Sequence, residues 1–360
     1  MPMEMLSYLD VNGNLSTNCQ HTIPDDQLVR GYEVMLMTRH IDDRMITLQR
    51  QGAISFAMSS YGEEGCVVAS AAALKLQDWL YPQYREDGIM FWRGATAQQY
   101  IHHMFCNGKD PILGRQMPNH FGSRELNIVT VSSPLATKIP HAAGCAYAMK
   151  LQKEDAIAVS YFGEGTTSKG DFHVGLNFAA LRHAPVIFFC RNNGYAISTK
   201  TSNQYAAFDV ASKGLAYGIT SYKVDGNDYF AVHETVTKAR QQCLDGAGPI
   251  LIEAVTYRLG AHSTSDDPSA YREDVEVEEW KGRDPVLRLS RYLRKKGLWD
   301  DEKERAFLDK IKGEVDEAIK VAKDTPPPPL SSIIEDVYFE VPPKLQREYD
   351  ELKTFFPETT

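Results

Sequence analysis

Short apolar runs alternate with amphipathic stretches through the second half of the chain. Runs of consecutive apolar residues predict buried parallel strands, and apolar residues at helical spacing predict helices between them. The predicted strands are 157–162, 186–190, 222–225 and 250–255, and the predicted helices are 171–181 and 230–244. This order of strands and helices is typical of a parallel sheet covered by helices on both faces.

Helical patterns also flank this region. Residues 25–51 carry apolar residues at helical spacing and end at Gly52, a typical C-terminal cap. The string Tyr61-Gly62-Glu63-Glu64-Gly65 then opens an alanine-rich helix that reaches Leu74. After Asp284-Pro285 the pattern predicts highly charged helices with apolar stripes.

The proline run at 326–329 ends these helices and begins an extended tail. Its apolar residues, among them Val337, Tyr338 and Phe339, favour packing on another subunit. We therefore expect an α/β fold, a doubly wound and mostly parallel sheet, followed by a helical C-terminal region and the tail. The expected parts are an extended arm at 1–24, the α/β domain at 25–283 and the C-terminal region at 284–360.

Two short motifs follow neighbouring predicted strands. Gly163-Glu164-Gly165 comes after the first strand and Asn192-Asn193 after the second, a separation that suits one βαβ unit of about 30 residues. Both motifs are therefore expected at the carboxyl edge of the sheet, where ligands bind in open α/β sheets. Glu164, the Asn193 amide oxygen and the Tyr195 carbonyl would suit Mg²⁺, with a diphosphate beside them.

A plain nucleotide-binding turn is the alternative for the first motif, because Gly-x-Gly after a strand is common by chance. The dinucleotide fingerprint would require a third glycine at position 168, where Ser168 stands. The asparagine pair favours the metal-diphosphate interpretation over this alternative.

Composition limits the classes of function. The formal net charge of −9, without a compensating basic run, disfavours a nucleic-acid partner. No apolar stretch approaches the length of about 18 residues that suggests a membrane span, and residues 1–18 resemble neither a signal peptide nor a transit peptide. The six cysteines show no metal-ligand spacing and are expected to be reduced thiols.

Gln83-Tyr84-Arg85-Glu86 is expected in a loop, where Arg85 suits a phosphate, although a lone loop arginine is more often a surface ion pair. Arg191, at the end of the second strand, suits the same diphosphate. Taken together, the chain resembles the alpha subunits of the decarboxylase component of branched-chain 2-oxoacid dehydrogenase complexes. Besides the motifs above, the resemblance rests on 114–118 (GRQMP), 132–137 (SSPLAT), 191–198 (RNNGYAIS) and 262–267 (HSTSDD).

This resemblance implies a thiamine-diphosphate-binding fold and assigns roles to individual residues. Those expected around the cofactor are Gln83, Tyr84, Arg85, Ser133, Leu135, Gly165, Thr166, Arg191 and His262. Glu164, Asn193 and Tyr195 would hold Mg²⁺, and Ser132, Pro134 and Thr137 would form a potassium site. Lys138 replaces the glutamine of that site, so we expect its ammonium group to substitute for the potassium ion.

His262 is expected to be catalytic, as a proton donor or a stabiliser of the bound intermediate, although a lone histidine is usually structural. The neighbouring Ser263 is expected to be a phosphorylation switch, which implies a kinase and a phosphatase. The simpler interpretation of this Ser/Thr/Asp cluster is a helix cap or a solvated loop. Glu273 replaces a second acceptor serine of animal relatives, so a single switch is expected.

The resemblance implies that the carboxylate that activates the cofactor's pyrimidine ring comes from a second polypeptide, and this sequence offers no credible candidate, so we expect a beta subunit within an α₂β₂ heterotetramer. The expected activity is decarboxylation of branched-chain 2-oxoacids and acyl transfer to a lipoyl group of the acyltransferase core. Two alternatives remain: a pyruvate dehydrogenase alpha subunit and a non-catalytic assembly subunit. The resemblance also implies the mitochondrial matrix, with the transit segment absent from this sequence.

Overall fold

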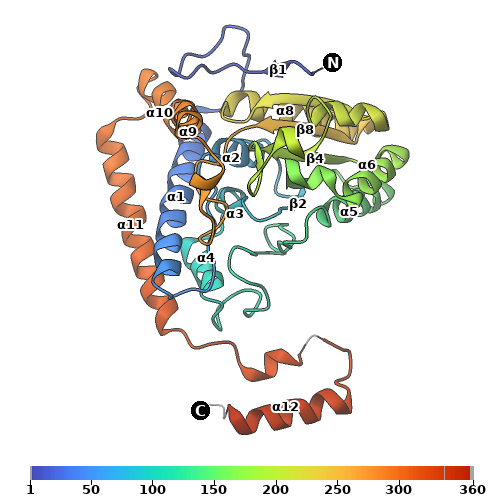
Figure 1. Cartoon of the computed structure of the whole chain (residues 1–360), viewed down its shortest axis with the longest axis vertical. Coiled ribbons are helices and arrows are strands. Elements are labelled where there is room, and N and C mark those ends of the chain that lie inside the picture. The colour runs from blue at the N-terminus through green and yellow to red at the C-terminus, as the bar shows by residue number, and fades with distance from the viewer. Residues whose placement is uncertain (1, 336, 357–360) are drawn as a thin grey trace.

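A six-stranded parallel sheet forms the centre of the molecule in a computed structural model, which describes residues 2–335 and 337–356 (Figure 1). In sheet order the strands are β1 (Met5–Leu6), β7 (Thr220–Asp225), β8 (Ile250–Val255), β4 (Val186–Asn192), β3 (Ala158–Gly163) and β2 (Trp79–Tyr81). Every neighbouring pair is parallel. All four predicted strands are present, within three residues of their predicted ends.

Alternate residues of the central strands point to opposite faces of the sheet. Phe162 and Phe188 belong to a hydrophobic cluster with α5 (Lys138–Gln152) and α6 (Gly170–Arg182). Tyr161 and Phe189 belong to the larger cluster on the other face. That face is covered by α1 (Asp25–Arg50), α2 (Glu64–Ala72) and α8 (Tyr229–Gln242). Helices on both faces confirm the predicted doubly wound fold.

The remaining elements are short or lie outside the sheet. The other helices are α3 (Asp87–Trp92), α4 (Ala97–Met104), α7 (Thr201–Gln204), α9 (Asp274–Lys281), α10 (Pro285–Lys295), α11 (Asp301–Asp324) and α12 (Pro343–Phe355). A small hairpin pairs β5 (Tyr195–Ala196) with β6 (Thr199–Lys200), and short 3-10 helices include η1 (Glu164–Ser168), η2 (Ala211–Tyr217) and η5 (Leu330–Ile333).

The C-terminal region is helical, as predicted. Helix α11 runs alongside α1, on the side of α1 away from the sheet, and also packs on α4 (Figure 1). Beyond the prolines at 326–329 the tail still contacts the body, where Arg115 donates a hydrogen bond to the Ser332 carbonyl oxygen at 2.9 Å. It then extends away from the body and ends in α12, a helix where the sequence predicts an extended tail (Figure 1). Phe339 in this tail is fully exposed. No helix in the described parts of the chain is long and apolar enough to cross a membrane.

The parallel sheet gathers four chain segments at one edge. Because the strands run in the same direction, the residues that follow β2, β3, β4 and β8 all leave the sheet at its carboxyl edge. These segments carry residues 83–86, the Glu164 turn, Asn193 and the His262 loop. The fold therefore brings together residues that are far apart in the sequence, as the 177-residue separation of Arg85 and His262 illustrates.

Candidate functional site

A cavity of about 380 Å³ opens at this carboxyl edge. All nine residues expected around the cofactor line it, and so do the three expected Mg²⁺ ligands. Additional lining residues that the sequence analysis did not select include Phe56, Met58, His120, Ile197 and Arg258. Ser132, Pro134, Thr137 and Ser263 are not among the residues that line it. The fold thus assembles most of the predicted site residues around one cavity.

The loop after β2 is held by Glu86. Its Oε2 accepts hydrogen bonds from the backbone N–H groups of Gln83, Tyr84 and Arg85, at 2.8, 2.9 and 3.0 Å. The Gln83 side chain in turn accepts a hydrogen bond from the N–H of Gly163 at 2.8 Å, which joins the loop to the end of β3. The carboxylate therefore fixes the backbone from which three predicted cofactor residues project.

Arg191 extends from the end of β4 into a buried acidic environment. Its Nε donates to Glu86 Oε1 at 2.6 Å, and its Nη1 donates to Glu63 Oε2. Arg191 is 1% exposed and both carboxylates are fully buried. The two carboxylates hold this guanidinium in the lining of the cavity. Neither acid was expected as a site residue, although a buried arginine after an apolar strand itself requires acidic partners.

The predicted magnesium ligands lie together. The N–H of Asn193 is 3.4 Å from Glu164 Oε2, and Asn193 Oδ1 accepts a hydrogen bond from the N–H of Tyr195 at 3.2 Å. The preceding motif also packs closely, since a Cβ on Gly165 would lie 2.6 Å from that of Ala196. Adjacent strand ends therefore place the acid and the amide as the motif spacing predicted.

The Glu164 carboxylate has an oxygen suited to a cation. Its Oε1 is buried without a hydrogen-bond partner. Burial, together with the negative charge of the nearby Glu63, raises the pKa of Glu164 to about 7. A carboxylate, an amide oxygen and a backbone carbonyl form the hard-oxygen donor set that Mg²⁺ prefers. Within residues 2–335 and 337–356 there is no group of three His, Cys, Asp or Glu side chains that could hold a metal ion. The unpartnered oxygen and the donor chemistry of this mixed set are the features that fit Mg²⁺.

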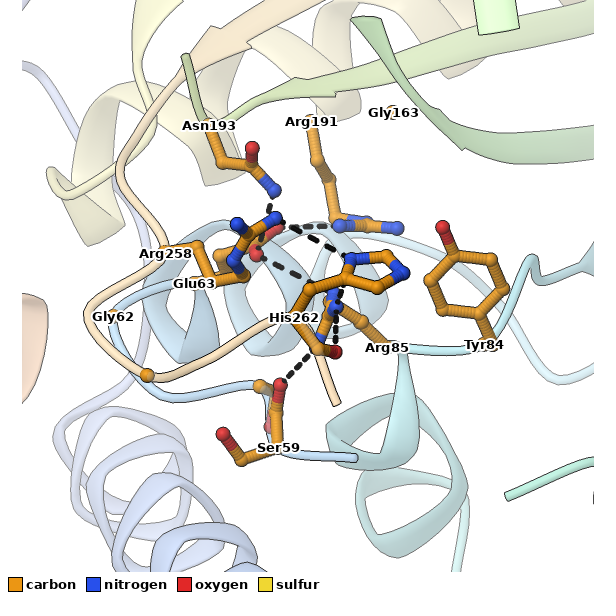
Figure 2. A network of polar contacts seen from close by, with 12 residues as sticks. Ser59, Gly62, Glu63, Tyr84, Arg85, Gly163, Arg191, Asn193, Arg258 and His262 are labelled. Atoms are coloured by element: carbon orange, nitrogen blue, oxygen red, sulfur yellow. Dashed lines mark hydrogen bonds and ion pairs between the residues drawn. The ribbon is translucent and has the colours of Figure 1, made fainter. Parts of the chain in front are cut away.

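His262 lies between two arginines (Figure 2). Arg85 Nη2 lies 3.0 Å from His262 Nδ1, and Arg258 Nη1 lies 3.5 Å from the same atom. The backbone N–H of His262 donates a hydrogen bond to Asp266 Oδ2 at 2.7 Å. Tyr84 packs edge-on against the imidazole, with 6.3 Å between the ring centroids. Burial, followed by the two arginines, lowers the pKa of His262 to about 4. The imidazole is therefore neutral at physiological pH.

A second histidine faces the cavity from another loop. His120 Nδ1 lies 2.9 Å from the Pro118 carbonyl oxygen, and its Nε2 is hydrogen-bonded to Ser133 Oγ. Because a carbonyl oxygen only accepts, Nδ1 carries the proton and Nε2 accepts from the Ser133 hydroxyl. Burial lowers the pKa of His120, which favours the neutral form of the imidazole.

The residues of the predicted potassium site lie just outside the cavity. Thr137 Oγ1 donates to the Pro134 carbonyl oxygen at 3.1 Å, and Ser132 directly precedes the cavity residue Ser133. Lys138 Nζ donates to the carbonyl oxygen of Thr130, and burial lowers its pKa. The ammonium group thus lies beside this segment, with a carbonyl partner outside the predicted set.

The comparison with known families agrees with this geometry. The sequence model of the family described as "Dehydrogenase E1 component" matches residues 32–331. The chain belongs to this dehydrogenase E1 family. Members of the E1 family depend in general on thiamine diphosphate, and membership of this family is consistent with a decarboxylating component.

Individual E1 relatives are similar over most of their length. The mitochondrial 2-oxoisovalerate dehydrogenase subunit alpha 2 of Arabidopsis thaliana is 47% identical over 344 residues, which cover 95% of this chain and 73% of the relative. The mitochondrial 2-oxoisovalerate dehydrogenase alpha subunit of Caenorhabditis elegans is 48% identical over 326 residues, which cover 90% of this chain and 75% of the relative. The corresponding subunit of Homo sapiens is 46% identical over 331 residues, which cover 92% of this chain and 74% of the relative. The resemblance to branched-chain E1 alpha subunits is therefore confirmed.

Proposed function

We propose that this chain binds thiamine diphosphate and Mg²⁺ and, together with a beta subunit, decarboxylates branched-chain 2-oxoacids. The acyl group is then transferred to a lipoyl group of an acyltransferase core. The observation that carries this proposal is the buried, unpartnered oxygen of Glu164 beside Asn193, at the ends of adjacent strands. The names of the relatives, all 2-oxoisovalerate dehydrogenase alpha subunits, support the substrate class.

The residues of the cavity divide into two regions. In the first, Glu164, Asn193 and the Tyr195 carbonyl would hold Mg²⁺, and the adjacent Gly165 and Thr166 would take the diphosphate, with Arg85 and Arg191 supplying positive charge. In the second, Ser133 and Leu135 would line the middle of the cofactor. When bound, thiamine diphosphate supplies the electron sink for decarboxylation.

His262 would act on the reacting part of the substrate. The two arginines at its Nδ1 only donate hydrogen bonds, so Nδ1 is the acceptor and the proton lies on Nε2. A neutral imidazole with its proton on Nε2 is suited to donate a hydrogen bond to a developing negative charge. Arg85 also donates to the His262 carbonyl oxygen at 2.5 Å, which fixes the backbone that carries the ring.

The proposal includes partners and regulation. An α₂β₂ assembly with the beta subunit would complete the cofactor site, because the resemblance implies that the carboxylate for the pyrimidine ring comes from that second subunit. Phosphorylation of Ser263 by a kinase, reversed by a phosphatase, would place a dianion beside His262 and Arg85. The relatives are named mitochondrial, and we extend that location, with the matrix as the compartment, to this chain.

Calorimetric titration of thiamine diphosphate into the full chain with its beta subunit tests the proposal. Binding is expected with Mg²⁺ and should weaken strongly with a chelator. Glu164→Gln should reduce the affinity by at least about tenfold, because it removes a charged metal ligand. Glu154→Gln changes an exposed glutamate and should have no effect. Equal binding with and without Mg²⁺ would contradict the proposal.

Decarboxylation assays then test the substrate. Activity with 2-oxoisovalerate should exceed activity with pyruvate. The reverse preference would favour the pyruvate-specific alternative, and cofactor binding without any decarboxylation in the complex would favour a non-catalytic subunit.

A further inference from the structure

Glu63 is a buried carboxylate that joins the strand end at Asn193 to the arginines around the cavity. It stands directly before α2 and is fully buried. Its Oε1 accepts a hydrogen bond from Asn193 Nδ2 at 2.9 Å, and its Oε2 accepts one from Arg191 Nη1. Arg85 Nε lies 4.0 Å from Oε1. Figure 2 shows Asn193 and these arginines converging on this one side chain.

The bond to Asn193 decides which atom of its amide faces the metal position. A side-chain amide has one accepting end, Oδ1, and one donating end, Nδ2, and the two are nearly equal in size. An ionised carboxylate only accepts, so Glu63 must face Nδ2. Asn193 Oδ1 is then turned toward the other side, where it already accepts from the Tyr195 N–H. A flipped amide would present N–H groups to a cation, which binds only through oxygen.

We propose that Glu63 is a positioning residue for the metal: it orients Asn193 so that the amide oxygen is available to a divalent cation. This inference rests on the proposed function, because it concerns the same Mg²⁺ site. Glu63 acts through Asn193 and is not itself a ligand of the ion. Partners of this kind, which orient a metal ligand by hydrogen bonding, typically contribute about 10- to 100-fold to metal affinity.

The neighbouring Glu64 offers a matched comparison. It is also fully buried and also paired with an arginine, Arg39, at 2.8 Å, and it accepts a hydrogen bond from the Gly62 N–H. Its partners lie toward α1 and do not include Asn193. Removing the charge of Glu64 therefore disturbs the fold much as removing the charge of Glu63 does, without changing the metal ligand.

Glu63→Gln should flip the asparagine. Arg191 donates directly to Glu63 Oε2 and needs an acceptor there, so the oxygen of the new amide will face Arg191, and its NH₂ group will take the Oε1 position that faces Asn193. Asn193 must then turn its oxygen toward position 63 and its NH₂ group toward the cation. We expect Mn²⁺ affinity in the presence of thiamine diphosphate to fall by at least about tenfold, against less than about twofold for Glu64→Gln.

A charge exchange tests the orientation itself. Asn193→Asp alone places two carboxylates about 3 Å apart, so it should bind Mn²⁺ poorly and fold less stably. In the double variant Glu63→Gln/Asn193→Asp, the amide NH₂ group introduced at position 63 donates to one oxygen of the carboxylate introduced at position 193. The other oxygen of that carboxylate stays available for the ion. Because the net charge of the pair equals that of the wild type, the double variant should bind Mn²⁺ more tightly than either single variant.

The experiment uses the full chain in complex with its beta subunit, and it measures Mn²⁺ binding by electron paramagnetic resonance with thiamine diphosphate present. Circular dichroism confirms that each variant is folded. Equal Mn²⁺ affinity of wild type and Glu63→Gln overturns the inference, and so does a double variant no better than its single parents. Absence of thiamine-diphosphate-dependent Mn²⁺ binding in the wild type instead overturns the proposed function. If Glu63→Gln fails to fold, the Mn²⁺ affinities of Asn193→Asp and the double variant are compared. Tighter binding by the double variant supports the inference, and equal or weaker binding overturns it.

Discussion

Arg85 Nη2 lies 3.0 Å from His262 Nδ1 and donates to the carbonyl oxygen of the same histidine at 2.5 Å. A single guanidinium thus fixes both the ring and the backbone of His262. Because the ring also lies near Arg258, the imidazole resists protonation, and its pKa falls to about 4 through burial and these two positive charges. Stability should therefore depend on pH through this residue.

His262→Gln should flatten the dependence of stability on pH. Between pH 6.5 and pH 4 the unfolded chain binds a proton at His262 and the folded chain does not. The stability of the wild type should therefore be complete above pH 6.5 and should fall as the pH is lowered through 4. Urea unfolding at pH 7.5 and pH 5 measures the slope, which should be smaller in the variant.

His233 provides the control for this prediction. It lies in α8 and is not among the residues that line the cavity, and burial lowers its pKa to about 4 as well. His233→Gln should also flatten the stability slope but leave turnover unchanged, whereas His262→Gln should reduce turnover by about 100-fold or more. Near-normal turnover of the His262 variant would exclude its catalytic role.

Glu86→Gln should destabilise the fold substantially. The substitution leaves Arg191 with one buried carboxylate and weakens the acceptor for three backbone N–H groups. We expect the free energy of unfolding to fall by about 3 kcal/mol. Asp301→Asn removes an exposed partner of Arg294 and should change the free energy of unfolding by less than about 0.5 kcal/mol. Similar losses in both variants would contradict the central role of Glu86.

Potassium should stabilise the wild type less than Lys138→Gln. In the wild type the ammonium group already lies beside the predicted ion-binding segment, bonded to the Thr130 carbonyl oxygen. The glutamine variant lacks this charge, so potassium chloride should raise its melting temperature by about 3 °C more than sodium chloride does. Equal potassium-specific stabilisation of the two proteins would exclude replacement of the ion by Lys138.

Ser263→Glu should lower activity by at least about tenfold, because a carboxylate beside His262 would compete for Arg85 and Arg258 and repel a diphosphate. The folded state should persist, since the Ser263 carbonyl retains its hydrogen bond from the Asp266 N–H. Ser265→Glu adds the same charge at an exposed residue two positions away and should be active. Wild-type activity of the Ser263 variant would count against a switch.

Phe339→Ser should weaken association with the beta subunit without affecting the stability of this chain. The phenyl ring is fully exposed, so its removal costs no buried contact. If the tail packs on another subunit, affinity should fall by about tenfold, as for a typical interface anchor. Size-exclusion chromatography of the mixed subunits measures this, with Leu76→Ser, a half-exposed residue outside the tail, as the control. An unchanged elution profile for the Phe339 variant would argue against the tail as a contact.

The strand-end motifs were predictable because geometry constrains them. Parallel neighbours must end at the same edge of the sheet, so Glu164 and Asn193 had to lie close once β3 and β4 were identified. Helix α5 was harder to predict from the sequence, since its many small residues, with Pro140 and Gly144, produce no clear apolar stripe.

Glu63 and Glu86 were missed for a different reason. Their partner Arg191 lies 128 and 105 positions away in the sequence, and no local pattern reports such pairing. A usable signal did exist: Arg191 follows five apolar residues of β4, and an arginine at the end of a fully buried strand needs buried acids. The sequence indicated that acidic partners exist, but only the packing of α2 and the β2 loop shows which ones they are.

The three backbone hydrogen bonds to Glu86 also affect the energetics of ligand binding. A loop that orders only when a ligand arrives loses conformational entropy at that moment, and the measured affinity is weaker by that amount. Gln83, Tyr84 and Arg85 are anchored by the chain itself, so this entropy is already lost during folding. The carboxylate thereby makes this wall of the cavity preorganised, and affinity there should depend little on loop motion.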